Sequence, residues 1–85
     1  MARIEITYTT KQTNFREIDE EIENIFAQHG GTQDGSGYGP EGREIVFNVF
    51  PDSELKRILN AFNKVGPMMK TRGVVETLKW KRLDA

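Results

Sequence analysis

The chain of 85 residues contains no cysteine and a single histidine, His29. Without thiols it can form no disulfide, no thiolate metal site and no cysteine nucleophile. One histidine also leaves few members for the common catalytic triads. His29 lies where a helix is expected to end, and a helix C-terminus favours its positive charge. We therefore expect no metal, no cofactor and no enzyme activity.

Long apolar runs are missing as well. No stretch approaches the ~20 apolar residues that a membrane-spanning helix needs. The segment Met1–Glu5 also lacks the apolar core of a signal peptide. We therefore expect a cytoplasmic protein with no membrane partner. A chain of this length is expected to form one domain, residues 1–85, around one modest core.

Alternating apolar and polar residues predict four strands. Residues 3–10 and 43–50 alternate most clearly, and residues 32–38 form a third, glycine-rich strand. In residues 74–83 the alternation places Val74, Leu78 and Trp80 on the core side. It places Val75, Thr77, Lys79 and Lys81 on the outer side.

Apolar residues at helical spacing predict two helices. The first is expected to begin at an N-cap, Asn14, and to end at His29-Gly30-Gly31, because glycine tolerates the left-handed backbone after a helix. The second is expected to follow Pro51-Asp52-Ser53 and to stop at Gly66-Pro67, since proline interrupts helices. Residues 68–73 are then a connector.

The order β-α-β-β-α-β predicts an α+β fold, a ferredoxin-like sandwich with two helices on one face of a four-stranded antiparallel sheet. Right-handed crossovers place the first and third strands in the centre and the second and fourth at the edges. The expected core comprises Ile4, Ile6, Tyr8, Phe15, Ile18, Ile22, Phe26, Ile45, Phe47, Val49, Leu55, Ile58, Leu59, Phe62, Leu78 and Trp80.

Six of the eight glycines fall within residues 30–42. A phosphate-binding loop would follow a strand and open a helix, whereas these glycines precede a strand. The better interpretation is a protected edge strand or a mobile hairpin, with a turn at 39–42. Tyr38 is the large side chain of this hairpin, and it is expected either to contact a partner or to pack on the core.

Charge is divided between the two halves of the chain. Residues 1–42 carry three basic and eight acidic side chains, and residues 43–85 carry nine basic and five acidic ones. Such asymmetry marks either a surface for a partner or two halves that attract each other in the fold.

An acidic surface is predicted on the first helix, where Asp19, Glu20 and Glu23 lie opposite the apolar stripe. It is either a solubilising face or a patch for a basic partner. With Tyr38, these residues form the expected protein-binding site. The expected function is that of a small binding domain, an inhibitor or modulator of a larger partner, of the immunity-protein, antitoxin or phage anti-defence type.

Two other functions compete with protein binding. Nucleic acid could bind the basic C-terminal strip formed by Lys70, Arg72, Lys79 and Lys81, although Glu5 and Glu44 would repel phosphate from the sheet face. An oligomerising sensor of a small ligand, such as a homodimer, is the third hypothesis.

Overall fold

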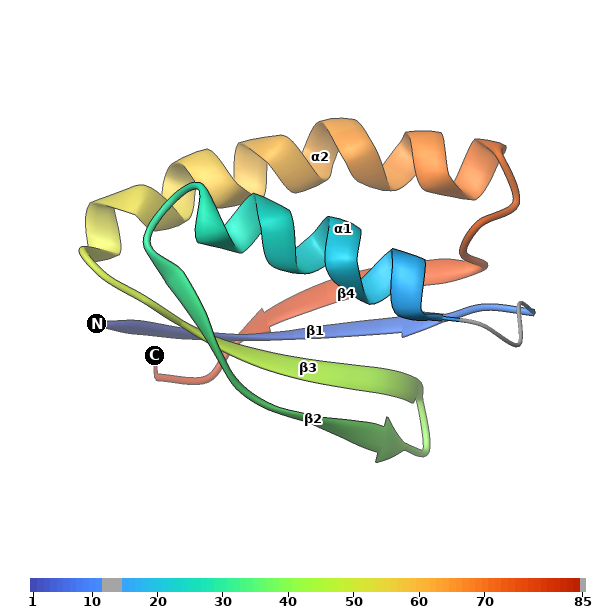
Figure 1. The fold of residues 1–85 in the computed structure, drawn as a ribbon, viewed down its shortest axis with the longest axis horizontal. Coiled ribbons are helices and arrows are strands. Elements are labelled where there is room, and N and C mark those ends of the chain that lie inside the picture. The colour runs from blue at the N-terminus through green and yellow to red at the C-terminus, as the bar shows by residue number, and fades with distance from the viewer. Residues whose placement is uncertain (12–14, 85) are drawn as a thin grey trace.

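The computed structural model describes residues 1–11 and 15–84, so the predicted N-cap Asn14 lies outside the described residues. Within these ranges no helix is long and apolar enough to cross a membrane. The elements follow one another in the predicted order (Figure 1). They are β1 (Ala2–Thr9), α1 (Arg16–Ala27), β2 (Gly31–Gly39), β3 (Gly42–Val49), α2 (Leu55–Thr71) and β4 (Thr77–Arg82), with a single 3₁₀ turn at Asp52–Glu54 before α2.

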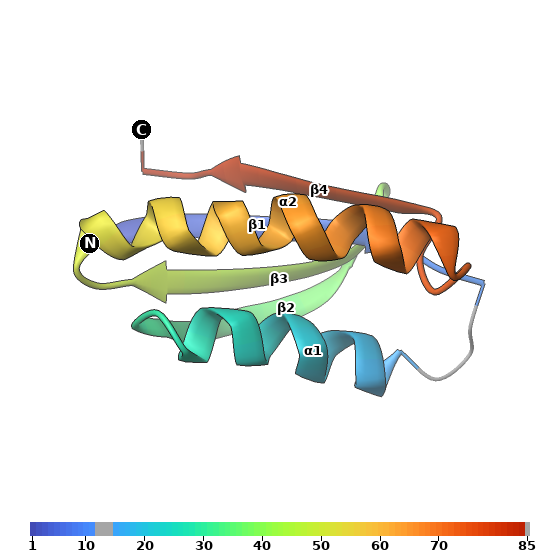
Figure 2. The same ribbon diagram turned by 90° about the horizontal axis from the view of Figure 1, so that it is seen from above.

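The four strands form one antiparallel sheet in the order β2-β3-β1-β4. The central positions of β1 and β3, and the edge positions of β2 and β4, are as predicted. Both helices cover the same face of the sheet, with α1 beside β2 and α2 over β1 (Figures 1 and 2). The opposite face is left without a helix.

The core lies between the sheet and the two helices. Phe26 of α1 stacks on Phe47 of β3 with ring centroids 3.8 Å apart, and Phe62 of α2 closes the group. Of the predicted core residues, Phe15, Leu59 and Leu78 are only partly buried, and Trp80 is 47% exposed. The buried apolar residues are Ala2, Ile4, Ile6, Tyr8, Ile18, Ile22, Phe26, Ile45, Phe47, Val49, Leu55, Ile58, Phe62, Met69 and Val75.

The predicted end of the second helix at Gly66-Pro67 was wrong, because α2 continues to Thr71 with Pro67 inside it. Proline in a helix interior removes one hydrogen bond and costs about 3 kcal/mol. The last turn offsets this by burying Met69 completely, and burial of a methionine side chain contributes about 1.5–3 kcal/mol. The Thr71 hydroxyl also donates to the Pro67 carbonyl at 2.9 Å.

The last strand is shorter than predicted and changes two side-chain assignments. The Val74 and Val75 backbone N–H groups donate to the Met69 carbonyl at 2.9 and 3.5 Å, so this segment folds back on the end of α2. Val75, expected outside, is buried there. Trp80, expected in the core, is on the helix side of an edge strand that α2 does not cover.

The glycine-rich strand is an edge strand, as predicted, with its turn at residues 39–42. The pairing of β2 with β3 shifts register between Gln33 and Gly35, which is a β-bulge. Gly35 and Gly37 face open space rather than a packed helix. Gly30, with φ +74°, supplies the left-handed backbone after α1, and a side chain there would meet the Phe50 carbonyl.

Candidate functional site

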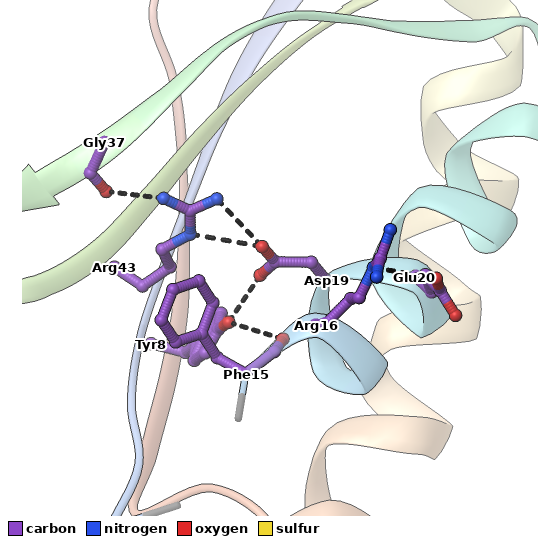
Figure 3. A network of polar contacts seen from close by, with 7 residues as sticks. All are labelled: Tyr8, Phe15, Arg16, Asp19, Glu20, Gly37 and Arg43. Atoms are coloured by element: carbon purple, nitrogen blue, oxygen red, sulfur yellow. Dashed lines mark hydrogen bonds and ion pairs between the residues drawn. The ribbon is translucent and has the colours of Figure 1, made fainter. Parts of the chain in front are cut away.

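A buried polar cluster joins four elements, β1, β2, β3 and α1, at one end of the sheet. Tyr8 of β1 pairs with Arg43 of β3, which pairs with Tyr38 of β2, so the three side chains lie in a row on the helix face. Asp19 of α1 reaches down to this row (Figure 3). Its Oδ2 accepts hydrogen bonds from Nη2 and Nε of Arg43 at 2.8 and 3.2 Å, and its Oδ1 accepts one from the Tyr8 hydroxyl.

Two aromatic rings enclose the Arg43 guanidinium. Its central carbon lies 4.9 Å from the Phe15 ring centroid and 5.3 Å from that of Tyr38. The two rings meet edge to face at 5.3 Å, and Nη1 of Arg43 approaches the Gly37 carbonyl at 3.5 Å. The β2–β3 hairpin is thus fastened to the start of α1 through one arginine.

Burial and charge shift the ionisation of this cluster. Desolvation raises the pKa of the Tyr8 hydroxyl well above its ordinary value, and its hydrogen bond to Asp19 raises it further. Burial opposes the charge of Arg43, but the hydrogen bond and negative charge of Asp19 outweigh it and raise the pKa of Arg43. At neutral pH the Tyr8 hydroxyl therefore keeps its proton and donates it to the carboxylate of the Asp19–Arg43 ion pair.

The cluster holds the structure together more than it offers reactive groups. Among the described residues, every buried side-chain nitrogen and oxygen has a hydrogen-bond partner. A cavity of about 180 Å³ adjoins Tyr8, Phe15, Tyr38 and Arg43, but both carboxylate oxygens of Asp19 already accept bonds. Tyr38, Phe15 and Arg43 together form a platform beside α1. Its exposed part is Tyr38, which is 64% exposed.

The predicted acidic surface on α1 is only partly as expected. Asp19, predicted to face away from the apolar stripe, is buried against Arg43, because a position four residues after Phe15 and three before Ile22 lies on the buried side. Glu20 is exposed and lies 3.8 Å from Arg16 across one helical turn. Glu23 is half-buried.

The remaining acidic side chains of α1 enlarge this surface. Glu17 and Glu21 are both exposed. Arg72, at the end of α2, lies 3.9 Å from Glu21. Among the described residues, acidic side chains of the first half pair with basic side chains of the second at Asp19–Arg43 and Glu21–Arg72, and the N-terminus of Met1 pairs with Asp52.

The residues predicted for nucleic-acid binding do not form one strip. Lys70 borders a groove between α2 and β4, whereas Arg72 turns towards α1. Lys79 and Lys81 stand opposite Thr7 and Glu5 in the register and so lie together on the sheet face without helices. The structure divides this set among three surfaces.

The single histidine lies beside a carboxylate. Nδ1 of His29 is 3.2 Å from Oε2 of Glu54, which ties the end of α1 to the start of α2. The part of the chain that the structure describes contains no group of three or more His, Cys, Asp or Glu side chains arranged to hold a metal ion.

Comparison of the chain with protein-family models, with curated proteins and with solved structures gives no match. Its function is therefore inferred from the geometry of the chain itself. Two features carry it: the platform formed by Tyr38, Phe15 and Arg43 beside the acidic face of α1, and the groove between α2 and β4.

Arg43 is the residue of this site that sequence reasoning missed. It is in phase with Ile45, Phe47 and Val49, which are all buried, so its side chain had to lie on the helix face of β3. An arginine on the buried side of a strand needs a carboxylate partner, because burying an unpaired charge is costly. Asp19 lies on the same side of α1 as the apolar stripe, and this position could have identified it as the partner of Arg43.

Proposed function

We propose that the chain is a non-catalytic protein-binding domain of ferredoxin-like fold that acts as an inhibitor or modulator of a larger partner. The fold part of the proposal is supported by the central positions of β1 and β3 and by two helices on one face. The cytoplasmic location stays a prediction from the sequence.

One observation carries the binding proposal: Tyr38 is 64% exposed and yet held in place. Phe15 contacts its ring edge to face, and Arg43 contacts its face. Binding that immobilises a free side chain loses about 0.5–1.5 kcal/mol, and a ring already held in place avoids part of that loss. Exposed tyrosines are also among the residues that contribute most at protein interfaces.

The chemistry of the surface defines its partner. Glu17, Glu20 and Glu21 are exposed on α1, whose first turns lie next to the platform. The partner that fits is a protein with a basic surface and a shallow recess for the Tyr38 ring. Asp19, expected in this interface, instead supports it from beneath through Arg43.

The test is recovery of the partner from cells of the source organism with a tagged protein, measured by quantitative mass spectrometry. Two variants alter the proposed surface, Glu17→Lys with Glu20→Lys, and Tyr38→Ala. The matched control reverses two charges of α2 that lie outside both surfaces, Lys56→Glu with Lys64→Glu. We expect one protein to be recovered by the wild type and the control and to fall at least ~10-fold with both surface variants, because like charges facing each other at an interface cost several kcal/mol.

Circular dichroism should show unchanged folding of all variants, since Glu20 and Tyr38 are exposed. Recovery that is equal for the wild type and both surface variants would reject the proposal. Nucleic acid that is recovered by the wild type and lost only with a further variant, Lys79→Glu with Lys81→Glu, would favour the competing hypothesis.

A further inference from the structure

The opposite edge of the molecule carries a groove that the proposed function does not use. It has a volume of about 260 Å³ and lies between α2 and the edge strand β4. Ile6 and Phe62 contribute to its lining from the core, and Leu78 and Trp80 from β4. The volume is below the ~300 Å³ at which small-molecule pockets begin, so it suits one or two apolar side chains.

The free side of β4 offers backbone hydrogen bonds along this groove. The Leu83 N–H donates to the Arg3 carbonyl at 2.7 Å, which marks Arg3 and Leu83 as a hydrogen-bonded pair between β1 and the end of β4. Such pairs alternate along antiparallel strands, so Lys81 and Lys79 also direct their backbone groups towards β1. The N–H and C=O groups of Leu78 and Trp80 therefore point away from the sheet, where β4 has no neighbour.

The side chains of β4 alternate between two chemistries. Leu78 and Trp80 stand opposite Tyr8 and Ile6, on the helix face beside the groove. Lys79 and Lys81 stand opposite Thr7 and Glu5, on the other face. A strand added to this edge would thus place alternate side chains beside apolar residues and beside lysines.

Positive charge is available at this edge. Lys70 of α2 borders the groove, and Lys79 and Lys81 follow on β4. Within residues 1–11 and 15–84, no ion pair involves any of these three lysines. The carboxylates of a ligand bound at this edge could therefore pair with these lysines without breaking an existing ion pair.

We propose that β4 and its groove bind an extended peptide segment in which apolar and acidic residues alternate. The segment adds a fifth strand to the sheet by bonding to the backbone of Leu78 and Trp80. Its apolar side chains enter the groove, and its carboxylates face Lys79 and Lys81. This site is independent of the proposed α1 surface, because the two lie on opposite edges of the sheet.

Two other occupants fit the edge less well. A second copy paired through its own β4 would place the lysines of one strand against those of the other, and like charges directly opposite are destabilising. A nucleic acid stacked on the sheet would meet Glu5 and Glu44 on the face without helices. Trp80 lies on the opposite face, beside α2, where little open surface remains for a base to stack on.

The experiment uses the full chain and a synthetic peptide that alternates Glu with Val and Leu over the length of β4. Trp80 is the only tryptophan and is 47% exposed, so its fluorescence reports directly on the groove. We expect a saturable blue shift of its emission. We also expect amide chemical-shift changes along β4 and the facing side of α2, with α1 unchanged.

Matched variants separate specific pairing from general attraction. Lys79→Glu with Lys81→Glu should weaken binding of the peptide at least ~10-fold, because like charges then face each other. Lys56→Glu with Lys64→Glu makes the same charge change at positions of α2 that do not line the groove, and should alter affinity less than ~2-fold. A peptide of the same composition with a central proline should not bind, because proline cannot donate to a strand ladder.

Several results would overturn the proposal. These are unchanged Trp80 emission, equal affinity of both charge-reversal variants, or equal affinity of the proline peptide. Sedimentation that shows a dimer burying Trp80 would assign the groove to a second copy. A single-stranded oligonucleotide that binds when the peptide does not, and is lost with the lysine reversals, would assign the edge to nucleic acid.

Discussion

The two edges of the sheet differ in a way that hydrophobicity alone does not explain. The β2 edge is poor in apolar side chains, with glycine at 31, 35, 37 and 39, yet α1 lies beside it and is tied to it through Arg43. The β4 edge has Leu78 and Trp80 on its helix face, yet only Leu78 comes close to α2, at Gly66, and a groove opens beside Trp80. The edge with less to bury is the one that an ion pair fastens to a helix, and in this sense it is the closed edge.

An ion pair explains the closed edge. Asp19 of α1 bonds Arg43 of β3, and Arg43 in turn holds Phe15 and Tyr38. The β4 edge has no equivalent bond from α2 among the described residues. Burial of apolar surface contributes about 25 cal/mol for each Å², so the half-exposed Trp80 stabilises the isolated chain less than a buried ring would. A ligand that covers Trp80 would gain this free energy on binding.

The largest expected effect comes from removing the bond that closes the β2 edge. Arg43→Met should lower the free energy of unfolding by about 3 kcal/mol, because it leaves the buried Asp19 carboxylate without its partner. This is the lower end of the range for buried pairs, since Arg43 and Asp19 keep 15% and 12% side-chain exposure. Urea denaturation measures the change.

Two controls sharpen this result. Arg72→Met breaks only the more exposed contact with Glu21 and should cost less than about 1 kcal/mol. The triple variant Tyr8→Phe, Asp19→Leu and Arg43→Met should recover most of the loss, because neither an unpaired charge nor an unpaired hydroxyl remains. A triple variant as unstable as Arg43→Met would show that Arg43 acts by packing rather than by charge.

The fold was largely predictable because most segments follow simple rules of burial. Strict alternation in β1 and β3 fixed the central strands, and Gly30 marked the end of α1. The errors fell where tertiary contacts override a local signal. Pro67 signals a helix end, but Met69 finds space in the core and carries α2 onward.

The candidate site was harder to predict because charged residues were read as exposed. The phase of Asp19 on α1 and of Arg43 on β3 indicates burial for both, but neither position shows which partner the other element supplies. The exposure of Trp80 could not be predicted from the sequence, for a different reason. It depends on how far α2 reaches across the sheet, and the pattern of β4 carries no information on that distance.

A smaller effect is expected from the tyrosine beneath the closed edge. Tyr8→Phe removes the hydroxyl that donates to Asp19 and should cost about 2 kcal/mol near neutral pH, as for other hydrogen bonds to charged groups. The phenol of Tyr8 also has a raised pKa in the folded chain, owing first to burial and then to Asp19.

This raised pKa predicts how stability changes with pH. Above about pH 10 the unfolded chain loses the phenol proton while the folded chain keeps it, so wild-type stability should fall by up to about 1.4 kcal/mol per pH unit. The Phe variant lacks this loss, and its deficit should narrow between pH 8 and about pH 11. Urea midpoints that run parallel over this range would contradict the folded-state shift.

The smallest expected effect is at the open edge. Trp80→Thr should change the free energy of unfolding by less than about 1 kcal/mol, because the ring is 47% exposed and threonine suits an edge strand. A fully buried aromatic ring would instead cost about 3–5 kcal/mol on truncation. A loss of that size in urea denaturation would mean that the groove is closed in solution. A small loss of stability together with a large loss of affinity for the alternating peptide would mean that Trp80 serves binding. The fold would then gain little stability from its ring.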